Sequence, residues 1–238
     1  MEIINDDGSF ESEIDFSGEY VSGATGEEYQ KGYNEGYAKA ESENPFYYAT
    51  RLDNVMGGAT FPENYEAVIK LKKAPKVCNY IFNNCSRGLK SVKMISEDQS
   101  NVVEFVSSLN LSDTGRATLE VVDLSEFNKK FSTLNMAFRY QAKLKSILGA
   151  LDLSECTNTT NAFLGCNALE DIEFVPNTIK ININFAYSNN LTAKSIQSII
   201  DGLATVETAQ TLDFHADIVA KLTEEQWVQI TDKNWSVL

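Results

Sequence analysis

Few side chains in this sequence are of the kinds that catalyse reactions or bind metals. The single histidine, His215, stands in no recognisable motif with a serine or cysteine nucleophile. Catalytic triads are recognised by geometry that nothing here provides, so we expect His215 to be structural or at the surface. The four cysteines contain no CxxC pair, which argues against a zinc site or a disulfide framework. We expect them to behave as small buried hydrophobes: Cys78, Cys85, Cys156 and Cys166.

Carboxylates are the abundant reactive group, with 34 acidic against 20 basic residues and a net charge of −14. Adjacent pairs such as Glu170/Asp171 and Glu224/Glu225 point to different sides of a strand or helix, so they do not form the facing pair of a glycosidase. Residues 6–13 lack the spacing of a calcium-binding loop, and P-loop, GxGxxG, HExxH and GxSxG motifs are absent from the sequence. The sequence therefore predicts no enzyme, no cofactor and no metal site. The excess of negative charge also argues against a nucleic-acid partner.

A short apolar run indicates how the chain is organised. In residues 161–174, NAFLGCNALEDIEF, the apolar positions are spaced three, three, three and then two apart: Phe163, Cys166, Leu169, Ile172 and Phe174. Because no single helix or strand has this spacing, the run must change conformation, as repeat units do.

The same pattern recurs along the chain. Phenylalanines at 82, 105, 138, 163 and 185 are 23, 33, 25 and 22 residues apart, and three of these intervals fall in the range of leucine-rich repeats. The long interval predicts an insertion of about ten residues within 111–120. A leucine follows most of these phenylalanines at a similar distance: Phe82–Leu89, Phe138–Leu144, Phe163–Leu169 and Phe185–Leu191.

The second half of each unit predicts a short strand. Leu169-x-x-Ile172-x-Phe174-x-x-Asn177-x-Ile179 fits the pattern L-x-x-L-x-L-x-x-N-x-L, and Leu148-x-x-Leu151-x-Leu153-x-x-Cys156 fits its cysteine form. Looser copies match the strand part only: Leu119-x-x-Val122-x-Leu124 and Leu89-x-x-Val92-x-Met94. Alternate apolar side chains of each strand should point into the core.

Ala162, Phe163, Cys166 and Leu169 resemble, position for position, the A-F-x-x-C-x-x-L segment of the BspA-type leucine-rich repeats of bacterial surface proteins. Ala137, Phe138 and Leu144 repeat this segment with Gln141 in place of the cysteine, and the resemblance covers roughly residues 74–191. It implies an α/β fold, a short irregular leucine-rich-repeat solenoid, and a role in adhesion or host-surface interaction.

The segment after the repeats, residues 192–238, reads as an α/β C-terminal cap. Apolar residues at helical spacing follow Thr192 and Ser195, either of which could cap the helix. Residues 209–215 alternate like a strand, and Thr223 with Gln226 has capping-box spacing before Trp227 and Ile230 on one helical face. The amino-acid sequence of this segment also resembles the C-terminal part of repeat proteins encoded by bacteriophages and prophages of gut bacteria.

Three different stretches precede the repeats. Residues 1–28 are acidic and rich in Gly and Ser, which predicts a flexible segment. Residues 29–44 place Tyr29, Tyr33 and Tyr37 four residues apart, as a stripe on a helix. This N-terminal helix either covers the end of its own solenoid or drives self-association or docking into a larger assembly. Residues 45–73 form a loop-rich N-terminal cap that leads into the first repeat.

These features together predict a non-catalytic binding or adhesion protein. The missing signal peptide and the phage-like C-terminal segment favour a phage or prophage virion component that contacts a host surface, present in the virion or in the host cytoplasm before assembly. The alternatives are a bacterial cell-surface adhesin with a trimmed N-terminus, or a purely structural virion decoration or assembly protein. Expected partners are a protein or glycan on a bacterial or host surface and a second copy or virion protein, without membrane insertion.

The residues expected to bind lie on the exposed side of the predicted strands. They would form an acidic face suited to a basic, amine-bearing or calcium-bridged partner: Glu120, Asp123, Asp152, Asp171 and Glu173.

Overall fold

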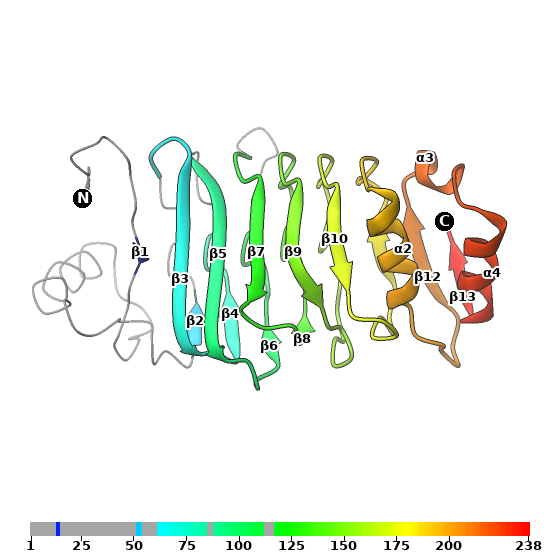
Figure 1. Ribbon diagram of the computed structural model, residues 1–238, viewed down its shortest axis with the longest axis horizontal. Helices are drawn as coiled ribbons and strands as arrows, with labels where there is room; N and C mark the ends of the chain where they lie inside the picture. Colours follow the sequence, from blue (N-terminus) through cyan, green and yellow to red (C-terminus); the bar gives the residue numbers. More distant parts are fainter. Residues whose placement is uncertain (1–12, 15–50, 54–60, 85–87, 112–116) are drawn as a thin grey trace, which may run out of the picture.

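The computed structural model describes residues 13–14, 51–53, 61–84, 88–111 and 117–238. The predictions for the flexible N-terminus, the Tyr29–Tyr33–Tyr37 stripe and Cys85 fall outside these residues. Within them the protein is α/β, with three sheets in which every pair of neighbouring strands is parallel (Figure 1).

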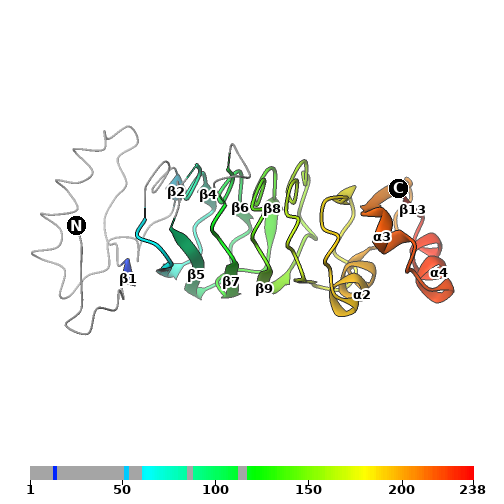
Figure 2. The same cartoon turned by 90° about the horizontal axis from the view of Figure 1, so that it is seen from above.

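Two of the sheets lie face to face, and the chain alternates between them. The six-stranded sheet has the order β1 (Glu13–Ile14), β3 (Tyr65–Lys73), β5 (Leu89–Asp98), β7 (Val121–Glu126), β9 (Ser146–Leu151) and β10 (Asp171–Phe174). The four-stranded sheet has the order β2 (Arg51–Asp53), β4 (Val77–Asn79), β6 (Val103–Glu104) and β8 (Phe131–Thr133). We call one pass of the chain through both sheets a winding. Figure 2 shows the windings stacked side by side, with the two sheets as opposite layers.

The C-terminal part combines a third sheet with helices. Strands β11 (Ile183–Phe185), β12 (Gln210–Phe214) and β13 (Trp235–Val237) pair in that order. The helices are α2 (Ala193–Gly202), the short α3 (Ala216–Val219) and α4 (Glu224–Asp232). Helix α2 lies directly beside β10, where another strand of the six-stranded sheet would otherwise follow (Figure 1).

Alternation of apolar and polar residues explains the strands. Val122 and Leu124 in β7 are buried, as are Ile172 and Phe174 in β10, while the residues between them face outward. Strand pairing brings equivalent residues into a column across the sheet: Val92, Val122, Ile147 and Ile172. This column confirms the predicted strand positions in three of the four units.

In the fourth unit the observed register differs from the predicted one. Ile147, and not Leu151, occupies the column, and Leu148, which was expected to point inward, is 41% exposed. After Ile147 a bulge at Gly149, which has φ +96°, shifts the register so that Leu151 pairs with Phe174. A Cβ atom at Gly149 would lie 2.8 Å from the Ser125 Cα, so a side chain would not fit there.

The repeated phenylalanines form a column of rings in the core. Ring centroids are 5.9 Å apart for Phe105 and Phe138, 5.6 Å for Phe138 and Phe163, and 4.7 Å for Phe163 and Phe185. The long interval between Phe105 and Phe138 therefore leaves the column unbroken. Such offset or tilted ring pairs contribute stabilisation beyond the apolar area they bury.

A second column consists of the residues three positions after Phe105, Phe138, Phe163 and Phe185. Each is buried and donates a side-chain hydrogen bond to a backbone carbonyl of the preceding winding. The Cys166 thiol donates to the Phe138 carbonyl at 3.1 Å and the Ser188 hydroxyl to the Cys166 carbonyl at 3.2 Å. Ser108 donates to the Cys78 carbonyl and Gln141 Nε2 to the Leu109 carbonyl. This position thus links each winding to the one before it.

The predicted helix caps in residues 192–238 are confirmed, with one difference. Thr192 accepts from the Ser195 N–H at the start of α2, and Thr223 and Gln226 form the capping box of α4. Ile230 is buried, but Trp227, one turn earlier on the helix, is 36% exposed. The buried tryptophan is Trp235, whose Nε1 donates to the Ala204 carbonyl at 2.8 Å.

Candidate functional site

The surface of the six-stranded sheet that points away from the four-stranded sheet is the candidate site, and we call it the outer face. In the described part of the chain no helix crosses it between β3 and β10 (Figure 1). Parallel sheets are usually covered on both sides, so an open face of this length is unusual. Its side chains are those between the buried positions of each strand: Val68, Lys70, Lys93, Ile95, Val121, Asp123, Ser146, Leu148, Asp171 and Glu173.

Asp123 lies near the middle of the outer face and is paired. Its Oδ1 accepts from the Ser125 N–H at 3.0 Å, and its Oδ2 lies 3.7 Å from Lys93 Nζ. Partial burial raises the pKa of Asp123, but the Ser125 hydrogen bonds and Lys93 outweigh that effect and hold it below its usual value. Lys93 also contacts Glu126 at 2.6 Å, which raises the pKa of the lysine. Both groups are charged at neutral pH.

Glu120 and Glu173 also have lysine partners. Glu120 lies 3.3 Å from Lys145 Nζ at the start of the strands, and Glu173 is hydrogen-bonded to Lys194 of α2. This bond raises the pKa of Lys194. The predicted acidic face is therefore a face of mixed charge, in which each of these carboxylates has a lysine beside it. Exposed pairs of this kind add little to stability, so their main effect is on the surface potential.

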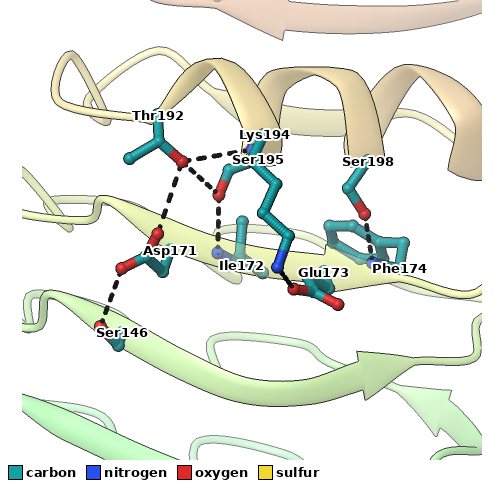
Figure 3. Close-up of polar contacts among 9 residues, drawn as sticks. All are labelled: Ser146, Asp171, Ile172, Glu173, Phe174, Thr192, Lys194, Ser195 and Ser198. Atoms are coloured by element: carbon teal, nitrogen blue, oxygen red, sulfur yellow. Dashed lines mark hydrogen bonds and ion pairs between the residues drawn. The ribbon is translucent and has the colours of Figure 1, made fainter.

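Asp171 has no lysine partner among the described contacts. Its two carboxylate oxygens accept from the hydroxyls of Ser146 and Thr192, each at 3.4 Å (Figure 3). It is exposed at the start of β10, and the nearby Lys194, which is hydrogen-bonded to Glu173, also attracts it electrostatically.

Asp152 does not lie with the other four predicted residues. It follows the end of β9, forms an isolated bridge with Lys130, and accepts from the Ser154 N–H at 2.9 Å. Its position is at the turn between the sheets. The structure thus brings Asp123, Asp171 and Glu173 onto the outer face, places Glu120 just before β7 and leaves Asp152 at the margin of the sheet, while Tyr29, Tyr33 and Tyr37 fall outside the described residues.

Aliphatic side chains on the outer face were missed by the sequence analysis. Leu148 is exposed in the middle of the face, and Val68, Ile95 and Val121 are half-buried there. Leu148 was assigned to the core because its spacing to Leu151 and Leu153 imitates the repeat. Leu148 points outward because it follows the buried Ile147 in regular alternation, and the glycine after it, Gly149, was the signal for the bulge that brings Leu151 back to the core.

Helix α2 closes the C-terminal edge of the outer face. The Ser195 hydroxyl accepts the Ile172 N–H and the Ser198 hydroxyl accepts the Phe174 N–H, both at 3.0 Å (Figure 3). These two N–H groups point away from β9 and would pair with the next strand of a longer sheet. Two serine side chains therefore replace a strand, and they prevent the sheet edge from pairing with another chain.

The described residues offer little for catalysis. His215 Nδ1 accepts the Asp217 N–H at 3.2 Å and so caps α3, in agreement with a structural role. Burial raises the pKa of the Cys166 thiol to about 12 and raises the pKa values of Cys78 and Cys156 as well, so these thiols are protonated and unreactive. Within the described ranges, no group of three or more His, Cys, Asp or Glu side chains is placed to hold a metal ion.

No helix in the described part of the chain combines the length and the apolar composition that a bilayer span requires.

Comparison with known proteins gave no match: no family model, no curated protein and no solved structure is similar to this chain.

Proposed function

We propose that this protein is a non-catalytic binding protein and that its described part is a short, irregular leucine-rich-repeat solenoid of the BspA type with an α/β C-terminal cap. The stacked windings, the phenylalanine column and the strand columns support this interpretation, because each matches a position of the repeat pattern. We further propose a phage or prophage virion component that contacts the host surface through the outer face. A function inferred partly from fold needs a test at the site itself.

The observation that carries this proposal is the uncovered outer face. It presents aliphatic side chains (Ile95, Val121, Leu148) between charged side chains that are already held in pairs. Such a surface needs little reordering of its side chains on binding, which lowers the cost of association. Aliphatic anchors surrounded by polar groups are also the usual composition of a protein–protein interface.

The composition of the outer face favours a protein partner over a glycan. The outward side chains of β5, β7, β9 and β10 are aliphatic, hydroxyl-bearing or charged, and none of them is aromatic. An aromatic ring would supply the flat apolar surface on which a sugar stacks. Asp171, which is hydrogen-bonded only to hydroxyl groups among the described contacts, suits a basic side chain of the partner.

The test uses the full chain, labelled, on intact cells of candidate host bacteria. Leu148→Glu places a charge in the centre of the outer face, and we expect cell binding to fall at least about tenfold, as for a central anchor of an interface. Val228→Glu is the matched control, because Val228 is equally apolar and more exposed but lies on α4. Equal binding by both variants would reject the outer face as the binding site.

Cells treated with protease separate the two classes of partner. A protein partner predicts loss of binding after this treatment, while binding that survives it would overturn the choice of protein over glycan. If the unmodified chain binds no host cell of the panel, the proposed contact with a host surface is wrong.

A further inference from the structure

A small cavity lies between the windings that contain Leu89, Leu109 and Gln141. It has a volume of about 10 Å³ and is lined by Thr118, Gln141 and five apolar side chains. This volume is close to the smallest that holds one water molecule. A ligand larger than one heavy atom does not fit.

Gln141 is the polar side chain that needs a partner in this cavity. It is 4% exposed, and its Nε2 donates to the Leu109 carbonyl, which fixes the amide orientation and directs Oε1 to the other side. Oε1 is one of three buried side-chain polar atoms without a hydrogen-bond partner among the described residues, the others being Asn110 Oδ1 and Arg139 Nε. A buried carbonyl oxygen without a donor is costly, so a native structure usually supplies one.

Thr118 provides the second polar group. Its hydroxyl donates to the Leu89 carbonyl at 2.9 Å, so that only its oxygen lone pairs are left for another contact. Gln141 Oε1 and Thr118 Oγ1 are therefore both acceptors. Whatever lies between them must donate two hydrogen bonds from a single heavy atom.

The neighbouring windings explain why the need arises here. Cys166 and Ser188 occupy the same repeat position as Gln141, and each uses its single polar atom to donate to the preceding winding. Gln141 follows the longest interval between phenylalanines, from 105 to 138, and its amide brings an additional acceptor that the shorter side chains lack.

We propose that the cavity binds one water molecule, which donates one hydrogen bond to Gln141 Oε1 and the other to Thr118 Oγ1. The water completes the hydrogen bonding at the irregular winding and is part of the folded structure.

A crystal structure of the full chain at high resolution tests this directly. We expect a density peak about 2.7–3.0 Å from Gln141 Oε1. A cavity without density, or a protein atom in that place, would overturn the proposal.

A solution measurement gives an independent answer. Gln141→Met keeps the length of the side chain and removes both polar atoms, so the number of long-lived internal waters, measured by ¹⁷O relaxation dispersion, should fall by one. Gln99→Met is the matched control, because Gln99 is exposed directly after β5, and it should leave the number unchanged. An unchanged number in Gln141→Met refutes the water site. If that variant does not fold, the crystal structure of the unmodified chain decides.

Discussion

At the end of β5, the Asp98 carboxylate accepts hydrogen bonds from the Ser100 hydroxyl and, at 2.8 Å, from the Ser100 N–H. Lys73 Nζ lies 3.0 Å away from it. These contacts, the Ser100 bonds first, lower the pKa of Asp98 to about 2. A carboxyl group with a lowered pKa stabilises the folded state above its ordinary pKa, and this contribution disappears as the pH falls through about 2.

We therefore expect Asp98→Asn to lower the urea midpoint at pH 7, and we expect the difference from the unmodified chain to shrink between about pH 4 and pH 2. Urea titrations at four pH values measure this difference in midpoint. Glu155→Gln serves as the control, since Glu155 is exposed in a turn. A difference that stays constant down to pH 2 would contradict the ionic origin of the effect.

Cys166 is the residue for which burial has the clearest chemical consequence. It is fully buried, and its pKa of about 12 leaves almost no thiolate at pH 8. We expect a thiol-specific reagent to leave Cys166 unmodified in the native protein and to label it fully in urea, as read by peptide mass spectrometry. Labelling at the same rate in both conditions would show that this winding opens readily.

Among the elements, α2 and β10 depend on each other through two serine hydroxyls. Ser195→Ala removes the acceptor of the Ile172 N–H and leaves it buried and unpaired, so we expect a loss of about 1–3 kcal/mol in the free energy of unfolding. Ser198→Ala should cost less, because its bond to the Phe174 N–H is only partly buried. Ser236→Ala, at an exposed hydroxyl of β13, is the control and should change stability by no more than about 0.5 kcal/mol. Equal effects from all three substitutions would mean that α2 does not depend on these bonds.

At the scale of the elements, the sequence predicted those strands, helices and caps that depend on a local residue pattern. The strands at Val122 and Ile172, the helix after Thr192 and the capping box at Thr223 follow from spacing and are confirmed. The bulge at Gly149 did not follow from the repeat pattern, because the repeat pattern does not show how closely the Ser125 backbone of the neighbouring strand β7 approaches. The position of Leu148 and the lysine partners of the predicted acidic residues depend on the same cross-strand register. The residue pattern of one strand does not encode its register against the neighbouring strand once a bulge shifts that register.

At the scale of the whole molecule, the negative charge is distributed unevenly along the chain. Residues 1–44 contain twelve carboxylates and two lysines and so carry most of the net negative charge, beside a nearly balanced remainder. The predicted Tyr29–Tyr33–Tyr37 stripe lies in this segment. The stripe was predicted either to cover the end of the solenoid or to drive self-association, and in the second case the proposed virion component would assemble through it.

We expect the full chain to be an oligomer in light scattering and a version that starts near Asn44 to be a monomer. High salt should not dissociate the oligomer if apolar tyrosine contacts hold it. A monomer in both cases would assign residues 29–44 to a cap and would favour a stand-alone binding protein.

The stacking of windings also has an evolutionary consequence. Residues 25 apart in the sequence contact each other across neighbouring windings at three separate places, Lys72–Glu97, Glu120–Lys145 and Ser146–Asp171. A gene that gains or loses a segment of this length keeps every such partner in register, because each winding contacts only the adjacent ones. The serines of α2 would still end the sheet after the last winding. Duplication of one winding at a time would therefore lengthen the stack of windings in the lineage of this protein. The existing C-terminal cap would still end the sheet.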